Sequence, residues 1–312
     1  SHRFAFLTSI ALLLLVGCGE SGETSSSGNG NSKGNGKPEI VRAAMEPLIS
    51  VKELKSRLKE SGLRILDARA PEQYEDPAGG HIPGAVFVDV AEWKTQMLDK
   101  EFRSDSDAWA EMVSGLGIEE LSNVVVYADN PTDAARIWWT LRFLGVENVA
   151  LLDGGWNAWQ AAEYKVSHDE TEVDAVAFQP TFHPERLMLV DDLQKAVKDK
   201  SASIVDARSP GEFAGTDGDE PRKGHVPGAV NIEWTELLDE EGRFKSKKDL
   251  KKLFADGKIA TDKPVVTYCR SGGRAALNAF ALELAGYSNV KSYYCGWQEW
   301  SATKKAPVAK PE

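Results

Sequence analysis

Cysteine and histidine are scarce in this chain of 312 residues, which has three cysteines and five histidines. A small and odd number of cysteines does not build a disulfide framework. The spacing of Cys18, Cys269 and Cys295 matches no zinc motif, so we expect neither a metal site nor an organic cofactor. Each cysteine therefore needs its own explanation.

An excess of positive charge is also missing, because 48 acidic residues outnumber 37 lysines and arginines and leave a net charge of -11. This balance argues against a nucleic-acid partner. The composition, 42% hydrophobic and 27% charged, is that of a soluble globular protein, and the length allows two ordinary domains. A local basic cluster can still bind a small anion.

Long hydrophobic runs are absent except near the start, where an apolar run over 4–16 is too short to span a bilayer comfortably as a helix. It is typical of a secretory signal. The residues before Cys18, with sequence LVG, resemble the lipoprotein box of bacteria, in which the cysteine is lipidated. We expect 1–18 to be a lipoprotein-type signal segment; the alternative is a plain signal with an incidental cysteine.

Residues 19–40 are rich in glycine, serine and asparagine, and this composition predicts a flexible tether. The resemblance at Cys18 then implies a protein of the bacterial cell envelope, lipid-anchored to a membrane and outside the cytoplasm.

An internal repeat organises the rest of the chain. Three segments of the first half recur in the second: 65–74 as 204–213, 81–90 as 225–234, and 124–159 as 265–300. A repeat of about 140 residues is too long for a solenoid unit and indicates two copies of one domain. We place the domains at 41–164 and 186–304, with an extended linker over 165–185.

Each copy alternates short apolar strands with helices, which predicts an α/β fold with a parallel sheet flanked by helices. In the second copy the expected strands are 203–206, 264–268 and 289–294, and the expected helices are 190–198, with an Asp cap, 274–286, ended by Gly286, and one starting at 297–300. Ligands of such sheets bind beyond the carboxyl ends of the strands, where Cys269 falls.

The repeat separates residues of the fold from candidates for chemistry. Three pairs occur in both copies and are assigned structural roles: Asp67 and Asp206, Arg69 and Arg208, His81 and His225. The Asp and Arg are expected to pair, because burying either alone is costly. The loop CRSGGR over 269–274 aligns with ADNPTD over 128–133 in the first copy. The cysteine, both arginines and both glycines therefore occur in the second copy alone.

This loop has the composition of a thiolate site. Positive neighbours and a helix N-terminus favour the thiolate, which is the reactive form of cysteine. Gly272 and Gly273 allow the backbone to turn its N–H groups inward as an anion nest, and Arg270 and Arg274 add charge. The alternative is an inert buried cysteine.

With its D-x-R, H-[IV]-P-G-A, C-R-x-G-x-R and G-x-W motifs, the chain resembles the tandem-domain rhodaneses, a family of sulfurtransferases. The resemblance covers both domains and implies two rhodanese-like domains, the second catalytic. It implies that Cys269 takes sulfur from thiosulfate as a persulfide and passes it to cyanide or a thiol. The residues implied in donor binding are Arg270, Ser271, Gly272, Gly273 and Arg274.

Relatives that use 3-mercaptopyruvate carry a loop like C-G-S-G-V-T, so the two arginines here favour thiosulfate. The chain departs from some relatives at Glu212, where they carry a basic residue, which puts the arrangement of the donor in doubt. Cys295 either resolves the persulfide or merely fills a glycine position.

Two other functions stay open. A membrane-tethered sulfur carrier would accept sulfur on Cys269 without much turnover. A cysteine phosphatase or arsenate reductase needs C-x5-R, whereas the spacing here is C-x4-R. The physiological acceptor and the oligomeric state are left undetermined by the sequence.

Overall fold

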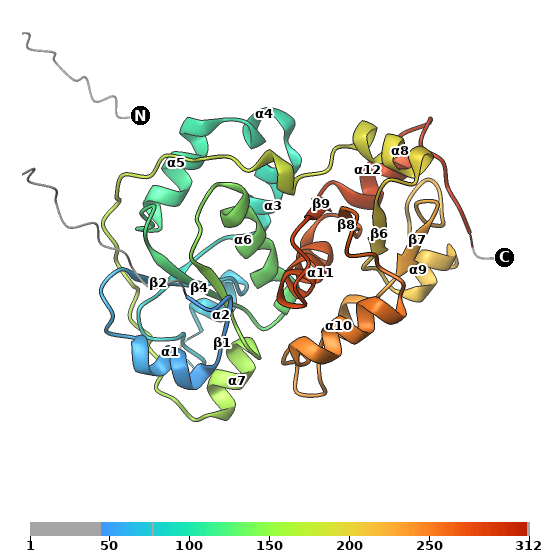
Figure 1. Ribbon diagram of the computed structural model, residues 1–312. Coiled ribbons are helices and arrows are strands. Elements are labelled where there is room, and N and C mark those ends of the chain that lie inside the picture. The colour runs from blue at the N-terminus through green and yellow to red at the C-terminus, as the bar shows by residue number, and fades with distance from the viewer. Residues whose placement is uncertain (1–44, 77, 311–312) are drawn as a thin grey trace, which may run out of the picture. The chain divides into compact units, whose positions relative to one another are not determined.

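Two parallel sheets carry the described part of the chain (Figure 1). The computed structural model describes residues 45–76 and 78–310, all within one compact unit, Arg42–Glu312. The predicted signal segment and tether, with Cys18, lie outside the described residues. Among the described residues, no helix is long and apolar enough to cross a membrane.

The first sheet has the order β1-β5-β4-β2-β3 and the second the order β7-β6-β8-β9, with every pairing parallel. The strands of the first sheet are β1 (Leu48–Ile49), β2 (Leu63–Asp67), β3 (Ala85–Phe87), β4 (Asn123–Tyr127) and β5 (Val149–Leu152). The strands of the second are β6 (Ser203–Asp206), β7 (Ala229–Asn231), β8 (Val265–Tyr268) and β9 (Val290–Tyr293). The duplication read from the sequence is therefore a duplication of the sheet.

Helices connect the strands in both halves. Those of the first half are α1 (Val51–Arg57), α2 (Pro71–Tyr74), α3 (Val90–Leu98), α4 (Lys100–Arg103), α5 (Ser106–Gly115), α6 (Pro131–Phe143) and α7 (Gly155–Ala161). Those of the second are η1 (Pro184–Arg186), α8 (Val190–Asp199), α9 (Pro210–Ala214), η2 (Trp234–Leu237), α10 (Lys247–Asp256), α11 (Gly273–Leu284) and α12 (Gly296–Ala302). The predicted Asp cap of α8 is wrong. Leu189 occupies the cap, and Asp191 and Asp192 lie in the first turn, where their charge suits the helix dipole.

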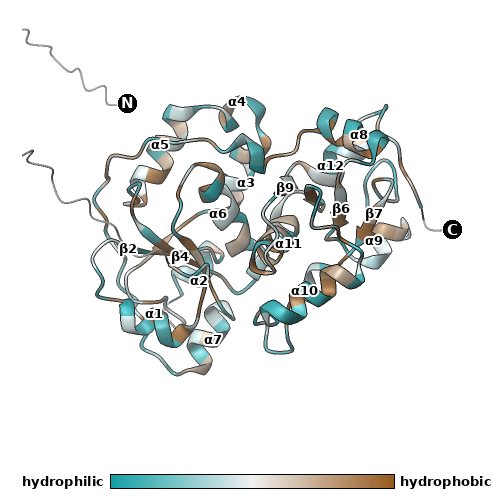
Figure 2. Ribbon diagram, viewed as in Figure 1, coloured by the Kyte–Doolittle hydropathy of each residue, from teal (hydrophilic) through white to brown (hydrophobic). Residues whose placement is uncertain are grey.

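The central strands are buried on both faces, as their unbroken apolar sequence predicts. All five residues of β4 and all four of β8 are buried. Alternate side chains of β4 enter two different hydrophobic clusters, so helices cover both faces of the sheet. Figure 2 shows β4 and β6 in the apolar colour.

One hydrophobic cluster contains residues of both halves, because α6 and α11 pack against each other. Trp138 of α6 meets Phe280 of α11 edge to face, with ring centroids 4.9 Å apart. This contact brings a helix of the first half beside the helix that follows Cys269.

The residues shared by the two copies have the predicted structural roles. Arg208 forms a two-pronged ion pair with Asp206 and donates to the carbonyl of Gly224 at 2.8 Å, and the first copy repeats the arrangement. His225 stacks on Phe213 with ring centroids 3.7 Å apart, and its backbone pairs with Ala309. These side chains fix loops at the strand ends and leave the chemistry to the loop of Cys269.

Candidate active site

Cys269 follows directly after β8, at the carboxyl end of the second sheet. The residue is 2% exposed and packs with Ala207 and Ala275. Because the thiol is buried, only a small reagent or a narrow end of a larger one can reach the sulfur. Position and access both fit the chemistry expected of the loop.

The backbone of the loop turns toward the sulfur at Gly272. Its N–H donates to the sulfur of Cys269 at 3.2 Å, and its φ of +97° lies in the left-handed region that favours glycine. A Cβ at this position would lie 2.8 Å from the ring of Tyr294, so the loop also needs glycine for space. Helix α11 begins at the next residue and points its N-terminus at the sulfur side of the loop.

Helix α12 also holds the loop, through hydrogen bonds from its first turn to the loop carbonyls. The backbone N–H of Trp297 donates to the carbonyl of Cys269 at 2.7 Å, and that of Gln298 donates to the carbonyl of Arg270 at 3.2 Å. Gly296 allows this approach, since a Cβ there would lie 2.3 Å from the carbonyl oxygen of Cys269. The two peptide groups that follow Cys269 are therefore fixed.

Arg274 is bound to Glu212, the residue at which the sequence departs from some relatives. The guanidinium donates to the two carboxylate oxygens at 2.6 and 2.9 Å. Burial of Glu212 opposes its ionisation, but the hydrogen bonds and charge of Arg274 outweigh it and lower the pKa of Glu212 to about 2. The departure is thus one half of an ion pair whose other half lies in the loop.

Arg270 also has a carboxylate partner, Glu220, at 2.7 Å from its Nε. Its side chain is 57% exposed and that of Glu220 only 9%. The sequence predicted that the two loop arginines supply charge to the anion nest. The structure differs in that a carboxylate already faces each of them, so neither guanidinium is an uncompensated cation.

Two further cations come from the first half of the chain, which the sequence interpretation had left out of the site. Arg136 of α6 donates at 2.7 Å to the carbonyl of Ser271 and at 2.7 Å to the hydroxyl of Tyr294. Arg136 is buried, and its Nε has no hydrogen-bond partner among the described residues. It therefore ties the catalytic loop to the other half of the molecule.

Lys94 of α3 lies close enough to Cys269, Arg136 and Arg270 to interact with them electrostatically. Burial lowers the pKa of Lys94, and the guanidinium charges of Arg136 and Arg270 lower it further, while Cys269 and Asp133 act in the opposite sense. Burial raises the pKa of Asp133, against the charges of Arg136 and Lys94. The first half thus brings two cations and one carboxyl group toward the loop.

The internal comparison holds the signal that could have found these residues. The counterparts of Arg136 and Lys94 in the second copy are Leu277 and Leu238, so both cations are confined to one copy. Arg136 also interrupts an otherwise apolar helix face, and a buried arginine must have partners. The comparison of the two domains singled out Cys269 as a residue of the second domain alone. It equally singles out Arg136 and Lys94 as residues of the first domain alone.

A family model described as "Rhodanese-like domain" matches the chain twice, over residues 50–162 and 189–303. The chain belongs to the rhodanese family. Within it, the second match contains Cys269 and the first contains Arg136 and Lys94. The α/β fold with two rhodanese domains is confirmed.

This rhodanese resembles proteins with two different names. It is 34% identical over 268 residues to the 3-mercaptopyruvate sulfurtransferase of Escherichia coli K12, covering 82% of this chain and 95% of the relative. It is 32% identical over 280 residues to the thiosulfate sulfurtransferase of Corynebacterium glutamicum, covering 86% and 91%.

Solved structures share its fold. The crystal structure of SseA from Escherichia coli, described as a 3-mercaptopyruvate sulfurtransferase with the rhodanese fold, has a TM-score of 0.68 and 31% identity, covering 81% of this chain and 99% of that one. The anaerobic ergothioneine biosynthesis enzyme of Chlorobium limicola has a TM-score of 0.76 at 20% identity, covering 85% and 70%, and shows the fold alone.

The corresponding loop of the first domain keeps the scaffold of the rhodanese without its reactive group. Ala128 takes the place of Cys269, and its carbonyl still accepts the N–H of Trp156 at 3.1 Å. Asp129 is bound by the amide of Gln73. The first domain holds no thiol at this position and presents carboxyl groups in place of arginines.

Cys295 lies at the start of α12 and lines a cavity to which no residue of the loop 269–274 contributes. Its sulfur is 3.6 Å from Nη1 of Arg103, and it lines a cavity of about 330 Å³ with residues such as Met188. Burial raises the pKa of the Cys295 thiol. In the described part of the chain, Cys269 and Cys295 are both free cysteines and form no disulfide. The backbone of Cys295, at φ −65°, does not require glycine.

Proposed function

We propose that this rhodanese is a sulfurtransferase in which Cys269 carries the transferred sulfur. The observation that carries the proposal is the sulfur itself, buried at the end of β8 under the N–H of Gly272. A backbone donor aimed at sulfur stabilises its negative charge in both the thiolate and the persulfide. The names of the two curated relatives described above, both sulfurtransferases, support the same reaction class.

The reaction proceeds in two steps. The thiolate of Cys269 attacks the sulfane sulfur of the donor, a new S–S bond forms, and the donor's own bond to that sulfur breaks with its electron pair. With thiosulfate the leaving group is sulfite. A nucleophilic acceptor, cyanide or a thiolate, then attacks the outer sulfur and releases the Cys269 thiolate, which gives ping-pong kinetics.

We propose thiosulfate as the donor, because its two negative charges match a site approached by Arg136 and Lys94 as well as by the loop arginines. A specific observation also favours 3-mercaptopyruvate as a second candidate: Arg270 and Arg274 are each matched by a carboxylate, which leaves less free charge for a dianion. Comparing kcat/KM for the two donors with cyanide as acceptor decides between them.

Intact-mass analysis after exposure to thiosulfate tests the covalent step. We expect one added sulfur atom, its removal by cyanide, and its absence in Cys269→Ser. Cys295→Ser is the matched control, since its thiol lies in another cavity, and it should label as the unaltered chain does. Labelling in Cys269→Ser, or no labelling with either donor, would contradict the proposal.

Turnover separates an enzyme from a carrier. Continuous formation of thiocyanate, abolished in Cys269→Ser, supports the sulfurtransferase, whereas stoichiometric labelling without turnover supports the carrier. Hydrolysis of small aryl phosphates is not expected. The guanidinium of Arg274 is paired with Glu212 and is therefore not available to bind a phosphate ester.

We also propose that Cys18 carries a lipid that holds this rhodanese at a bacterial membrane outside the cytoplasm. Support comes from the apolar run and the LVG sequence before Cys18, which lie outside the described residues. In a bacterial host, the full chain should enter the membrane fraction and Cys18→Ser should not. Equal distribution of both chains would overturn this proposal and leave the reaction untouched.

A further inference from the structure

One loop of the second domain, over 216–223, places a carboxylate against the catalytic loop. The stretch between Asp206 and His225 is five residues longer than the stretch between Asp67 and His81 in the first domain. The longer stretch contains this loop, whose sequence TDGDEPRK has three acidic residues. The added length therefore belongs to the domain that holds Cys269.

The two ends of the loop meet at a pair of glycines. A Cβ at Gly215 would lie 2.9 Å from the backbone nitrogen of Gly224. Both glycines have a positive φ, +77° and +129°. Compact surface loops whose ends lie close together are frequently functional.

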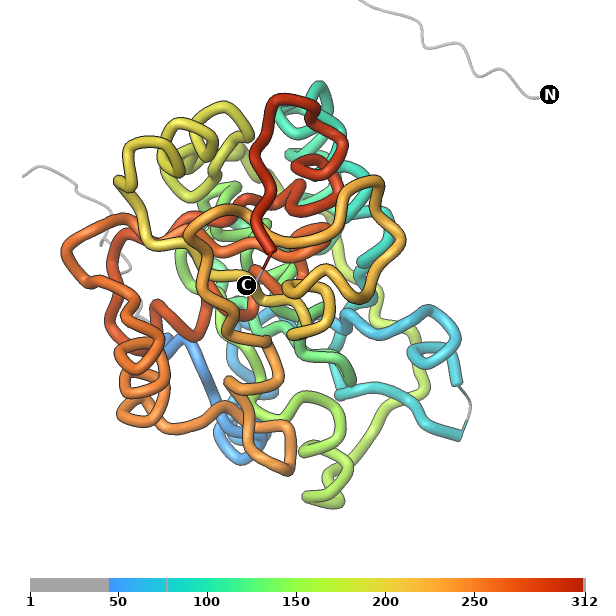
Figure 3. Tube along the Cα trace, turned by 90° about the vertical axis from the view of Figure 1, so that its right-hand side faces the viewer, coloured from blue at the N-terminus to red at the C-terminus, as the bar shows by residue number. Residues whose placement is uncertain are grey.

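Arg222 anchors the loop to the C-terminal end of α12. Its guanidinium donates at 2.6 to 2.8 Å to the backbone carbonyls of four residues, Trp300, Ser301, Thr303 and Ala306. Figure 3 shows the red C-terminal segment beside the loop that precedes β7. Pro221 restricts the residue before it to an extended backbone. Glu220 is therefore positioned by the two residues that follow it.

Glu220 is directed at Arg270, the residue after the nucleophile. Its Oε1 lies 2.7 Å from Nε of Arg270. The carboxylate is the buried partner of this pair and the guanidinium is the exposed one. Gly218 leaves room for the carboxylate, since a Cβ there would lie 2.6 Å from its Oε2. The shape of the loop thus favours the pair.

The first domain shows that this pair is not part of the shared scaffold. The counterpart of Arg270 is Asp129, and its partner is Gln73, which is the counterpart of Glu212. In the second domain Glu212 binds Arg274 instead. The partner of Arg270 comes from the lengthened loop.

We propose that Glu220 sets the selectivity of the site for the charge of the sulfur donor, because it occupies the guanidinium that the anionic end of the donor would otherwise meet. This role rests on the proposed function, in which the donor places its sulfane sulfur at Cys269 and its charged end toward solvent. The sulfur of Cys269 is buried, and Arg270 follows it with an exposed side chain.

The effect of Glu220 depends on the charge of the donor. Coulomb energy scales with the product of the charges, so neutralising one cation costs a dianion twice the attraction that it costs a monoanion. Glu220 therefore shifts the preference of the site away from thiosulfate and toward the singly charged 3-mercaptopyruvate.

The first test measures anion binding without sulfur transfer. Thiosulfate, and pyruvate as a monoanion, are titrated by calorimetry into full chains that carry Cys269→Ala. Adding Glu220→Gln should tighten the binding of thiosulfate by roughly three- to tenfold, and that of pyruvate by less. Asp219→Asn is the matched control, because it removes the same charge from an exposed neighbour, and it should change neither affinity. Equal tightening by the two changes, or none, overturns the proposal.

A double-mutant cycle tests whether Glu220 acts through Arg270. In chains with Arg270→Gln, the change Glu220→Gln should give no further tightening, because the contested guanidinium is gone. Glu220→Asp keeps the charge and should bind thiosulfate more like the unaltered loop than Glu220→Gln does. An undiminished gain without Arg270, or an equal gain in Glu220→Asp, overturns the proposal.

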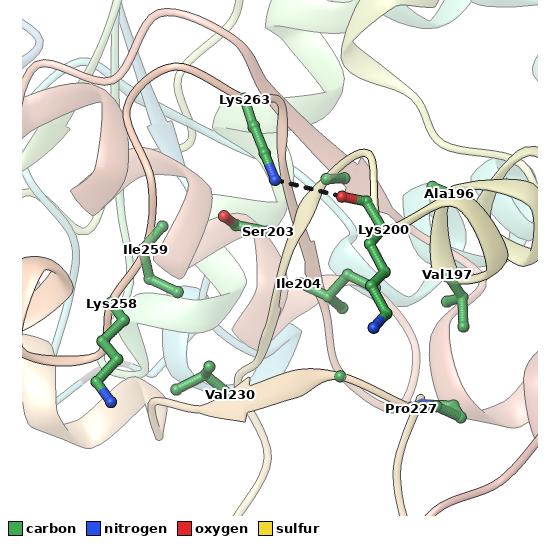
Figure 4. A pocket seen from close by; sticks show the side chains of 12 residues that line it. Ala196, Val197, Lys200, Ser203, Ile204, Pro227, Val230, Lys258, Ile259 and Lys263 are labelled. Carbon is green, nitrogen blue, oxygen red and sulfur yellow. Dashed lines mark hydrogen bonds between the residues drawn. The ribbon is translucent and has the colours of Figure 1, made fainter.

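Three lysines provide a control for anion binding elsewhere in the domain. Lys200, Lys258 and Lys263 line a cavity of about 370 Å³ at the amino end of β6 (Figure 4). No residue of 216–223 or 269–274 lines this cavity. Changing the three lysines to Gln should leave the gain from Glu220→Gln intact. Disappearance of that gain would place the anion at the lysines and overturn the proposal.

Kinetics of the chain with its thiol complete the test. Glu220→Gln should raise the ratio of kcat/KM for thiosulfate to that for 3-mercaptopyruvate, chiefly through KM, and salt should reduce the gain because exposed charges are screened. An unchanged ratio overturns the proposal. If neither donor labels Cys269, the proposed function fails, while the anion affinities still decide the role of Glu220.

Discussion

At the scale of single residues, the reactive sulfur depends on side chains that carry no sulfur chemistry themselves. Arg136 joins the carbonyl of Ser271 to the hydroxyl of Tyr294, whose ring in turn lies against Gly272. Glu212 holds Arg274. The loop is thus oriented by one residue from each domain.

Arg136→Gln is expected to lower kcat/KM for sulfur transfer on the order of 10- to 100-fold, because the carbonyl of Ser271 loses its cationic donor and the loop shifts. Arg136→Lys should recover part of the loss. Measuring kcat and KM separately distinguishes a misplaced loop from general unfolding. Arg142→Gln, on the same helix and paired with Glu147, is the control. Equal activity in Arg136→Gln and Arg142→Gln would contradict a positioning role.

The ion pair of Glu212 predicts a pH dependence of stability. Its pKa is about 2 in the folded chain and near 4.5 when unpaired, so the folded state binds fewer protons in that window. The pair's contribution is present above pH 4.5 and is lost as the pH falls toward 2. Urea unfolding of the unaltered chain and Glu212→Gln should therefore give a difference in free energy of unfolding that shrinks between pH 6 and pH 3. A constant difference over that range would be inconsistent with the pair.

The sequence was sufficient for some residues and not for others. Cys269 stood out because its counterpart is Ala128, and the D-x-R pairs could be assigned because an unpaired buried charge is costly. Glu212 was noticed as a departure, but its partner was not, since 62 residues separate it from Arg274 and only the folded chain brings them together. Arg136 was missed because the first domain was judged only by its loop over 128–133, which lacks the cysteine, arginines and glycines of the second.

At the scale of elements, the turn from β8 into α11 concentrates the requirements on backbone geometry. Gly272 must adopt a left-handed conformation there and must also leave room for Tyr294. Gly286, after α11, has nearly the same φ, +95°, with no atom within 4 Å of an added Cβ. A side chain at Gly286 would meet only the unfavourable backbone conformation, whereas one at Gly272 would also clash with Tyr294. Comparing the two positions therefore separates the two costs.

Gly286→Ala is expected to lower the free energy of unfolding by about 1 kcal/mol, the cost of a left-handed alanine. Gly272→Ala should cost more, and should also reduce sulfur transfer on the order of tenfold or more, because the N–H that faces the sulfur moves. Thermal unfolding and initial rates on both variants check this. Comparable effects of the two changes on activity would argue against a special role of the turn.

Elements were easier to predict than their ends. The largely apolar run of β8 marked it as a strand, because a strand covered on both faces shows few polar side chains. In β9 the polar residues Lys291 and Ser292 interrupt the apolar pattern. The cap of α8 was misplaced because Asp191 and Asp192 are good capping residues in general, while the N-cap is Leu189, two residues before Asp191.

At the scale of the whole molecule, the two domains share one hydrophobic cluster across α6 and α11. Trp138 and Phe280, each buried, form one of its contacts across the domain boundary. A shared core couples the unfolding of the parts that build it. The duplicated domains are therefore not independent modules.

Calorimetry of this rhodanese should show a single unfolding transition for its two domains, with equal calorimetric and van't Hoff enthalpies. Trp138→Ala should lower stability by about 3–5 kcal/mol and should also reduce sulfur transfer, although Cys269 is in the other domain. Two separated transitions, or a destabilised but fully active Trp138→Ala, would show that the domains act independently.

The contact of α6 with α11 also makes the first domain, which has no cysteine between residues 41 and 164, a target for inhibition. A molecule that separated these two helices would move Arg136 away from the loop. It would inhibit sulfur transfer without reacting with Cys269. Such a compound would act at the contact between the two domains and would leave the Cys269 thiol chemically unmodified.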